Sequence, residues 1–228
     1  MGILADITSA KPSATYKSLL KIGTAANQEL DATARVVEDG LGTASPLYLS
    51  TSEVQVKSFT ANSVGGGFDA ATVTSYVSKI NGVIESTFLV DIEDLLVSGT
   101  VKDVIGEDGV AAAYITQITT AVNGIIYKAE MACTEAPAGS NTTADIDLVT
   151  NSAYVSEDAA YDSGFGSSVI LITAGAAYTN GSFRSSADGT DMGNCVSDYL
   201  YIANGSGANS GGTYTAGKFV IKLYGASF

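Results

Sequence analysis

Hydrophobic and polar residues alternate along much of this chain with the two-residue period of a β-strand. From Ile125 to Cys133 the odd-numbered positions form an apolar face. Near the end of the chain Phe219, Ile221 and Leu223 point to one side, and Lys218, Val220 and Lys222 point to the other. Both patterns predict strands with one buried face, and no sustained helical period competes with them.

Several shorter segments add to this pattern. Strands are also expected at residues 83–92, 144–149, 168–173 and 199–203. The apolar run at 168–173 is continuous, which predicts a strand buried on both faces. Residues 71–80 fit either a strand or a short helix, and Asn123-Gly124 is a hairpin signal.

Strands separated by Gly-rich turns define the expected fold class. We expect a mainly β fold, an antiparallel β-sandwich with a jelly-roll-like topology. An immunoglobulin-like sandwich is the alternative, although the chain has no tryptophan for its core. The 25 glycines fit a protein whose ordered parts are sheets joined by loops.

The N-terminal part of the chain is expected to be organised differently. Val36 and Val37 lead into Asp39-Gly40, a turn signal, and residues 47–56 have the pattern of two short strands. Gly65, Gly66 and Gly67 interrupt the chain shortly afterwards. The expected division is an extended N-terminal arm, a Gly-rich linker and a β-sandwich domain, at residues 1–62, 63–68 and 69–228.

Charge is distributed unevenly and excludes several functions. Residues 1–60 carry six acidic and five basic side chains, whereas residues 61–228 carry 18 and six, and the whole chain has a net charge of −13. An acidic chain disfavours nucleic acid and anionic membranes as partners. There is no histidine, which removes Ser-His-Asp and Cys-His catalysis and the common zinc sites. We see neither a membrane span nor a secretory signal.

Candidate chemistry is sparse. Asp91 lies in an acidic cluster, and Asp145 and Asp147 share one face of an expected strand, so paired carboxylates could serve sugar hydrolysis or bind calcium. A solvated acidic surface explains them as well. Cys133 and Cys195 are expected to be free, buried thiols. We therefore expect no catalytic residue, no metal site and no cofactor.

Tyrosine offers a second kind of candidate. The chain holds 12 tyrosines, and several fall in expected loops. Aromatic side chains with a polar tip are common in binding surfaces. The expected surface-loop binding residues are Tyr154, Tyr161, Tyr178 and Tyr214. The alternative is that these tyrosines lie at strand ends and in the core.

Residues 30–56 resemble a segment near the N-terminus of virion proteins of tailed bacteriophages, which include head-fibre, decoration and tail-fibre proteins. The matching positions are Arg35, Val36, Asp39, Gly40, Gly42, Ser45, Pro46, Leu47, Leu49, Ser50, Thr51, Val54 and Val56. Thr43 stands where asparagine is more usual in the family. The ending, residues 214–225, loosely resembles the last strand of sandwich domains in such proteins.

The resemblance implies a virion structural protein without enzymatic activity. Its N-terminal arm would bind the particle, that is, the major capsid protein or other virion proteins. The arm residues implicated are Arg35, Val36, Asp39, Gly40, Pro46, Leu47 and Leu49. The family also favours a homo-oligomer, a trimer above all, assembled in the host cytoplasm.

Three functions stay open from the sequence. The first is a capsid-attached head fibre, knob or decoration protein. The second is a tail fibre or adaptor whose sandwich binds a receptor or a host surface glycan through the tyrosine loops. The third is a carbohydrate-active enzyme that uses a carboxylate pair, with Asp91 and Asp145 as the residues to test.

Overall fold

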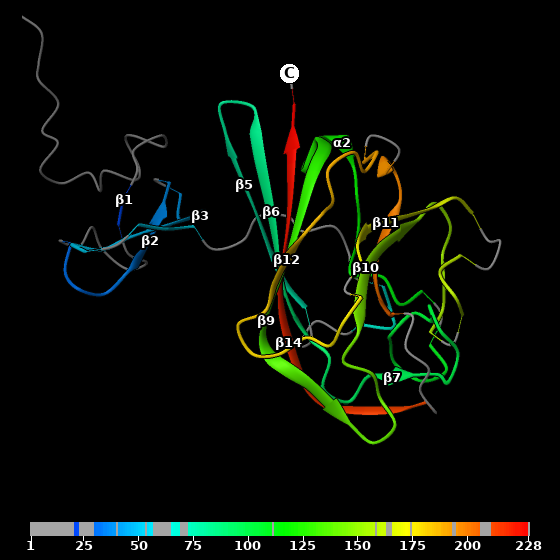
Figure 1. Ribbon diagram of the computed structural model, residues 1–228. Helices are drawn as coiled ribbons and strands as arrows, with labels where there is room; N and C mark the ends of the chain where they lie inside the picture. The colour runs from blue at the N-terminus through cyan, green and yellow to red at the C-terminus, as the bar shows by residue number, and fades with distance from the viewer. Residues whose placement is uncertain are drawn as a thin grey trace, which may run out of the picture. The chain divides into compact units, whose positions relative to one another are not determined.

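Antiparallel sheets make up most of the fold, as the sequence predicts (Figure 1). The computed structural model describes residues 21–22, 30–39, 41–52, 54–56, 65–68, 73–110, 112–157, 159–162, 166–173, 175–192, 195–205 and 211–227. The chain divides into two units, Met1–Phe59 and Thr60–Phe228.

The first unit contains a four-stranded antiparallel sheet in the order β1-β2-β3-β4. Its strands are β1 (Lys21–Ile22), β2 (Arg35–Glu38), β3 (Ala44–Leu49) and β4 (Val54–Val56). The turn between β2 and β3 is held by Asp39, whose Oδ1 accepts hydrogen bonds from the backbone N–H of Leu41 at 2.9 Å and of Thr43 at 2.8 Å. The described part of the expected extended arm is therefore a small folded sheet, because its short strands pair with each other.

The larger sheet of the second unit has the strand order β12-β9-β14-β6-β5, with β7 paired to the start of β14. Its strands are β5 (Val73–Ile80), β6 (Val83–Asp91), β7 (Leu96–Val97), β9 (Ile125–Gly139), β12 (Phe183–Ser185) and β14 (Gly212–Ala226). The segment that fitted a strand or a helix is thus a strand, β5. The last strand, β14, lies between β6 and β9 and pairs with both over most of its length.

The smaller sheet has the order β11-β10-β13-β8. Its strands are β8 (Thr116–Gln117), β10 (Ile146–Asn151), β11 (Ser168–Ile172) and β13 (Tyr199–Asn204). β11 was expected to be buried on both faces, which is wrong: it lies at the edge of the sheet, and Ile170 in it is 42% exposed. The central strand β10 is the one that is buried at every position.

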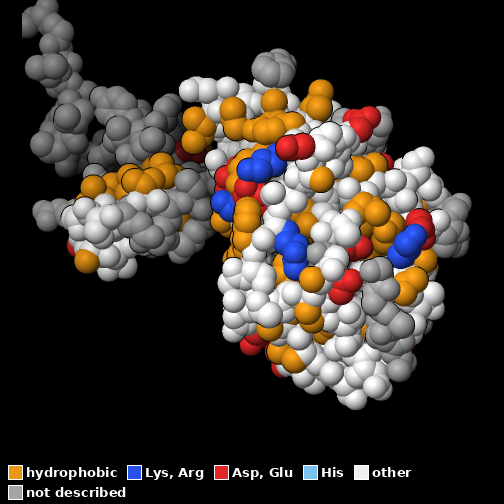
Figure 2. Space-filling view, in the orientation of Figure 1, with side chains coloured by type: hydrophobic (Ala, Val, Ile, Leu, Met, Phe, Trp, Pro, Cys, Tyr) orange, Lys and Arg blue, Asp and Glu red, His pale blue; other side chains and the backbone are white. Residues whose placement is uncertain are grey.

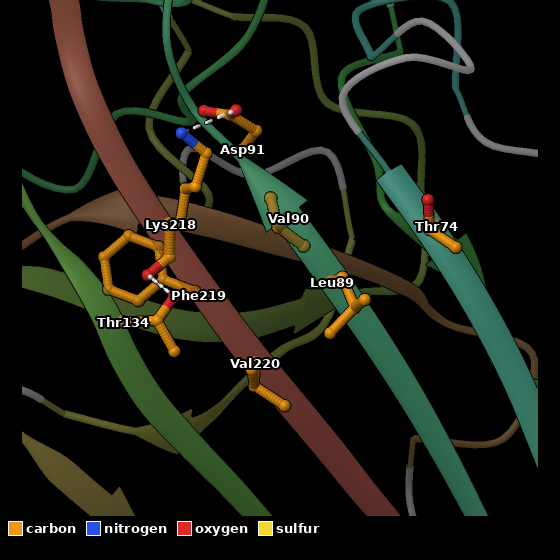
Figure 3. A pocket seen from close by; sticks show the side chains of 8 residues that line it. All are labelled: Thr74, Leu89, Val90, Asp91, Thr134, Lys218, Phe219 and Val220. Carbon is orange, nitrogen blue, oxygen red and sulfur yellow. Dashed lines mark hydrogen bonds and ion pairs between the residues drawn. The ribbon is translucent and has the colours of Figure 1, made fainter. Parts of the chain in front are cut away.

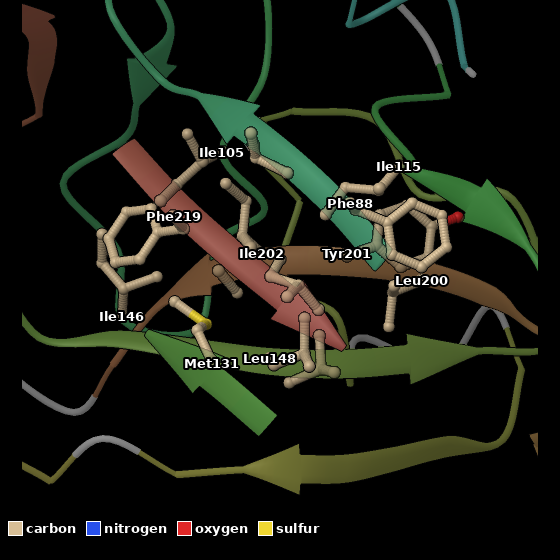
Figure 4. Close-up of a cluster of buried hydrophobic side chains, with 14 of the residues drawn as sticks. Phe88, Ile105, Ile115, Met131, Ile146, Leu148, Leu200, Tyr201, Ile202 and Phe219 are labelled. Carbon is tan, nitrogen blue, oxygen red and sulfur yellow. The ribbon is translucent and has the colours of Figure 1, made fainter. Parts of the chain in front are cut away.

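Both sheets of the second unit contribute to one hydrophobic core, so the unit is sandwich-like. Figure 4 shows Met131 and Phe219 of the larger sheet in the same cluster as Ile146, Leu148 and Ile202 of the smaller sheet. Each of these five side chains is at most 1% exposed. Burial of this apolar surface is the main favourable term in folding.

Two Asn-Gly pairs play different parts in the fold. Asn81 and Gly82 both have positive φ, 52° and 83°, and form the two-residue turn between β5 and β6. Asn123-Gly124, expected to form a hairpin, instead ends the four-residue helix α2 (Thr120–Asn123), with Gly124 as its C-cap. No helix in the described part of the chain has the length and apolarity that crossing a membrane requires.

The expected Gly-rich linker differs from the structure where it is described. Gly65, Gly67 and Phe68 are buried within the second unit. The N–H of Gly65 donates to the carbonyl of Tyr114 at 2.9 Å, and the N–H of Glu107 donates to the carbonyl of Gly67 at 3.0 Å. Residues 65–68 are therefore part of the folded unit, because glycine lets this backbone approach its neighbour closely.

Replacing Gly65 with alanine should destabilise the second unit. An ideal Cβ at this position would lie 1.9 Å from the carbonyl oxygen of Ala112 and 2.8 Å from the backbone nitrogen of Tyr114. Overpacking of this kind costs about 1–3 kcal/mol. We expect thermal unfolding of Gly65→Ala to begin well below that of the wild type. Gly66→Ala is the control, because Gly66 is exposed; equal melting temperatures for both variants would contradict the packing described above.

Candidate functional site

Three partly exposed tyrosines form a contiguous aromatic cluster on the second unit. The ring centroids of Tyr154 and Tyr199 lie 4.5 Å apart, those of Tyr114 and Tyr199 4.9 Å apart, and those of Tyr114 and Tyr154 5.8 Å apart. Tyr154 is 59% exposed, and Tyr114 and Tyr199 are half-buried. We refer to Tyr114, Tyr154 and Tyr199 as the tyrosine cluster.

A buried fourth tyrosine, Tyr201, holds the loop that carries Tyr154. Its hydroxyl accepts a hydrogen bond from the N–H of Val155 at 3.0 Å and donates to the carbonyl of Ala153 at 3.0 Å. The two backbone groups flank Tyr154 in the sequence. Because Tyr201 is fully buried in β13, this hydroxyl fixes an exposed aromatic ring to the hydrophobic core.

Backbone hydrogen bonds position Tyr114 just as firmly. The N–H of Ala113 donates to the carbonyl of Val155 at 3.1 Å, and the N–H of Ile115 donates to the carbonyl of Leu200 at 2.7 Å. Tyr114 therefore lies between the loop of Tyr154 and the strand of Tyr199. Gly65 closes the other side through its hydrogen bond to the carbonyl of Tyr114.

The arrangement suits binding. A hydrogen bond with Tyr154, together with partial burial, raises the pKa of Tyr199 to about 12. The hydroxyl therefore stays protonated at neutral pH and is both a donor and an acceptor. Adjacent ring faces with hydroxyl tips offer apolar contact and hydrogen bonds at low entropic cost. Such a surface fits a sugar ring or a protein side chain.

The four tyrosines expected in surface loops differ in their exposure to solvent. Tyr154 is exposed as expected, but Tyr161, Tyr178 and Tyr214 are 2%, 1% and 0% exposed, so the prediction is wrong for these three. The hydroxyl of Tyr214 donates to the carbonyl of Thr143 at 3.0 Å. Tyrosine can be buried in this way when its polar tip finds a partner.

Tyr178 shows how a tyrosine outside the strands still joins the core. Its ring meets Phe219 edge-on at a centroid distance of 5.3 Å, and the guanidinium carbon of Arg184 lies 4.7 Å from its centroid. The predicted surface loop at Tyr178 is therefore wrong. Tyr114 and Tyr199 are not among the predicted binding residues, although the spacing Tyr199-Leu-Tyr201 already puts two tyrosines on one face of a strand.

A hollow of about 380 Å³ on the larger sheet is the second candidate (Figure 3). Leu89, Val220 and Thr74 line it, and so does Lys218. The ammonium of Lys218 is 3.3 Å from Oδ2 of Asp91 and 2.8 Å from Oε2 of Glu135. These carboxylates raise the pKa of Lys218, so the lysine remains a cation.

The aspartates and cysteines that the sequence offers as candidates are either ion-paired or buried. Asp91 is paired with Lys218, and Asp147 is buried in β10. Within the residues that the structure describes, no group of three Asp, Glu, Cys or His side chains could hold a metal ion. Cys133 and Cys195 are free and buried, which confirms that prediction, and burial raises the pKa of both thiols.

The arm residues fall on the small N-terminal sheet. Arg35 and Val36 belong to β2, and Leu47 and Leu49 to β3. The guanidinium of Arg35 pairs with Asp31, and Asp39 holds the following turn. Hydrogen bonds from Thr43 lower the pKa of Asp39. Gly40 and the side chain of Pro46 lie outside the described residues.

Comparison with protein-family models, curated proteins and solved structures finds no match to this chain. The tyrosine cluster, the hollow and the N-terminal sheet are therefore interpreted from their own geometry and from the resemblance of residues 30–56 to phage virion proteins.

Stability should fall at high pH because tyrosines in the core resist ionisation. Burial raises the pKa of Tyr161 and of Tyr178 to about 12 each. In the unfolded chain both pKa values return to about 10. The unfolded state therefore releases protons first, and stability is lost as the pH rises from about 10 to 12.

Melting temperature measured against pH at constant salt checks this expectation. The curve should begin to fall above about pH 8, where the thiols of the unfolded chain ionise, and should fall further between about pH 10 and 12, where its tyrosines ionise. Tyr161→Phe should make the descent shallower, because it removes one of the tyrosines whose pKa burial raises. A melting temperature that stays constant up to pH 12 would contradict the raised pKa values of the buried tyrosines.

Proposed function

We propose that the chain is a non-enzymatic structural protein of a tailed-phage virion. The N-terminal unit anchors it to the major capsid protein or to another virion protein, and the sandwich-like unit is displayed on the surface as a decoration protein, knob or head fibre. The observation that carries the proposal is that the phage-like segment, residues 30–56, lies in a separate unit, Met1–Phe59. Anchor and displayed part then correspond to two units of the fold.

The N-terminal sheet has features that suit attachment. β4 is the last strand in its sheet, and Val54 in it is 69% exposed. An edge strand can add to a sheet edge of a partner through backbone hydrogen bonds. The displayed unit, in contrast, carries most of the negative charge, which keeps it soluble and away from DNA.

Removal of residues 1–59 should abolish attachment without unfolding the displayed unit. The hydrophobic core of the second unit lies entirely within residues 60–228, so its melting temperature should change little. Purified virions from a deletion strain would be incubated with the full-length or the truncated chain. Gold-labelled antibody against residues 69–228 should then label particles only after addition of the full-length chain.

The same labelling distinguishes the outcomes. Label over the head supports a capsid-attached protein, and label confined to the tail supports the second candidate below. Binding of the truncated chain would show that the anchor lies elsewhere. Val54→Asp, at the exposed edge strand, should weaken attachment, whereas Leu41→Asp is the matched control, since Leu41 is 67% exposed in a turn outside the strands.

The tyrosine cluster favours a second candidate function. A tail fibre or tail adaptor must bind a receptor, and a surface glycan is the class of ligand that stacks on exposed tyrosine rings. The hydroxyl of Tyr201 holds the loop of Tyr154 in place, which reduces the entropy lost when a ligand binds. This candidate differs from the first in location and in ligand.

Glycan-array binding by the full chain tests the second candidate. Tyr154→Ala and Tyr199→Ala should each reduce binding of any glycan that is recognised by about 10-fold or more, because each removes one stacking face. Tyr127→Ala is the matched control, since Tyr127 is 55% exposed on β9 and outside the cluster. Equal losses in all three variants, or no binding by the wild type, would leave the capsid role as the better proposal.

A further inference from the structure

The outward-facing side of the larger sheet differs in charge from the rest of the second unit. It carries three lysines, Lys128, Lys218 and Lys222, and four carboxylates, Glu85, Asp91, Glu130 and Glu135. All seven take part in ion pairs with one another. The other charged residues in 61–228 are three basic and fourteen acidic side chains, so this side is nearly neutral and the remainder is strongly negative.

Apolar side chains on this side form two rows that cross the sheet. The strand register defines four successive rows of side chains across this side, and the apolar ones are the first and the fourth. The first row consists of Leu89, Val220, Ala132 and Phe183, with Thr74 at its end. The fourth row consists of Ile80, Val83, Ala226 and Ile125. Leu89 and Phe183 are 43% and 58% exposed, and Ile80 and Val83 are 68% and 51% exposed. We call the surface formed by these rows and the residues between them the outer face.

Polar and charged residues occupy the two rows in between. Lys222 and Glu130 lie in the second row, and the third row holds Glu85, Tyr224 and Lys128. Lys222 is 2.8 Å from Glu85, and the hydroxyl of Tyr224 donates to Glu130 at 2.7 Å. From the first to the fourth row the order is therefore apolar, charged, charged, apolar; Lys218, with Asp91 and Glu135, lies beyond the first row. Figure 2 shows hydrophobic side chains gathered at the end of the sheet where β5 turns into β6, with charged side chains beside them.

Across these four rows the order is the same in both directions, as an isologous contact requires. We consider a second copy related to the first by a two-fold axis that runs parallel to the rows, between the second and the third row. The fourth row of the second copy then lies over the first row of the first copy, and the charged second and third rows of the two copies meet. Both charged rows hold charges of each sign. The hollow next to Leu89 and Val220 provides room for apolar side chains from the opposite copy.

The area is sufficient for a specific contact. Nine residue pairs join β6 and β14, which corresponds to about 30 Å at about 3.3 Å per residue. Four strands about 4.8 Å apart add a width of about 19 Å, so a flat face measures about 570 Å². Two such faces bury about 1,100 Å², above the roughly 1,000 Å² expected of a biological interface.

We infer that the outer face is the surface on which two copies of this chain pair. Copies of a chain with net charge −13 repel each other over most of their surface. The outer face is nearly neutral and carries two exposed apolar rows. A second copy that approaches this face therefore meets the least electrostatic repulsion and buries apolar side chains on contact. In this arrangement β6 lies over β6, and Leu89 of one copy faces Val83 of the other.

Sedimentation velocity of the full chain over about 1–100 µM tests the inference. The wild type should shift from monomer to dimer with concentration. Leu89→Glu and Val83→Lys should each weaken the dimer at least about 30-fold, because each places a charge against an apolar row. A mixture of the two variants should regain association, since the new glutamate and the new lysine then face each other across the contact.

Val196→Glu is the matched control, because it adds the same charge at a 38% exposed position outside the outer face. It should dimerise like the wild type. A wild type that stays monomeric, a trimer or dimer that survives both substitutions, or a mixture that fails to associate would each overturn the inference. Melting temperatures of all variants verify folding; should Leu89→Glu unfold, Val83→Lys alone decides. The outcome does not depend on particle attachment, which the labelling experiment tests separately.

Discussion

The second unit depends on the pairing of its last strand, β14, with two strands from much earlier in the chain. β14 lies between β6 and β9, and every second side chain, Phe219, Ile221 and Leu223 among them, enters the core. The two-residue period makes the register strict, because a slip by one residue would expose these side chains and bury Lys222. The contacts are distant in sequence, so the core can close only when the whole unit is present.

The tyrosine cluster follows from the same core. Tyr201 is buried in β13, and the cost of burying its hydroxyl is offset by two hydrogen bonds to the loop around Tyr154. An exposed ring is thereby held by a group inside the protein. Gly65 completes the arrangement, since the space beside Tyr114 admits no larger side chain. The candidate binding surface is thus stiff because it is built on the packing of the fold.

Local sequence patterns predict the strands, but they do not predict which residues outside the alternating segments are buried. The alternation at residues 125–133 and 219–223 marks β9 and β14, and the mainly β fold class follows from such segments. Tyr161 and Tyr178 are buried although they lie outside the strands, and Tyr214 lies at the start of β14 with its hydroxyl bonded to the distant Thr143; no local pattern encodes such contacts. In the same way, three glycines in a row look like a linker, because the close neighbour that requires glycine is far away in sequence.

The two surfaces proposed for binding belong to different sheets and differ in the chemistry of their side chains. The tyrosine cluster rests on β13 of the smaller sheet and presents uncharged rings, whereas the outer face belongs to the larger sheet and balances its charges internally. Ion pairs exposed to water contribute little to stability, so the concentration of three lysines on one face is poorly explained by folding alone. The three lysines have a larger effect on association, because on this face they neutralise the negative charge that would otherwise repel a second copy. A pairing face on one sheet leaves the cluster on the other sheet open to a ligand in each copy, and two linked sites bind a multivalent surface more tightly than one.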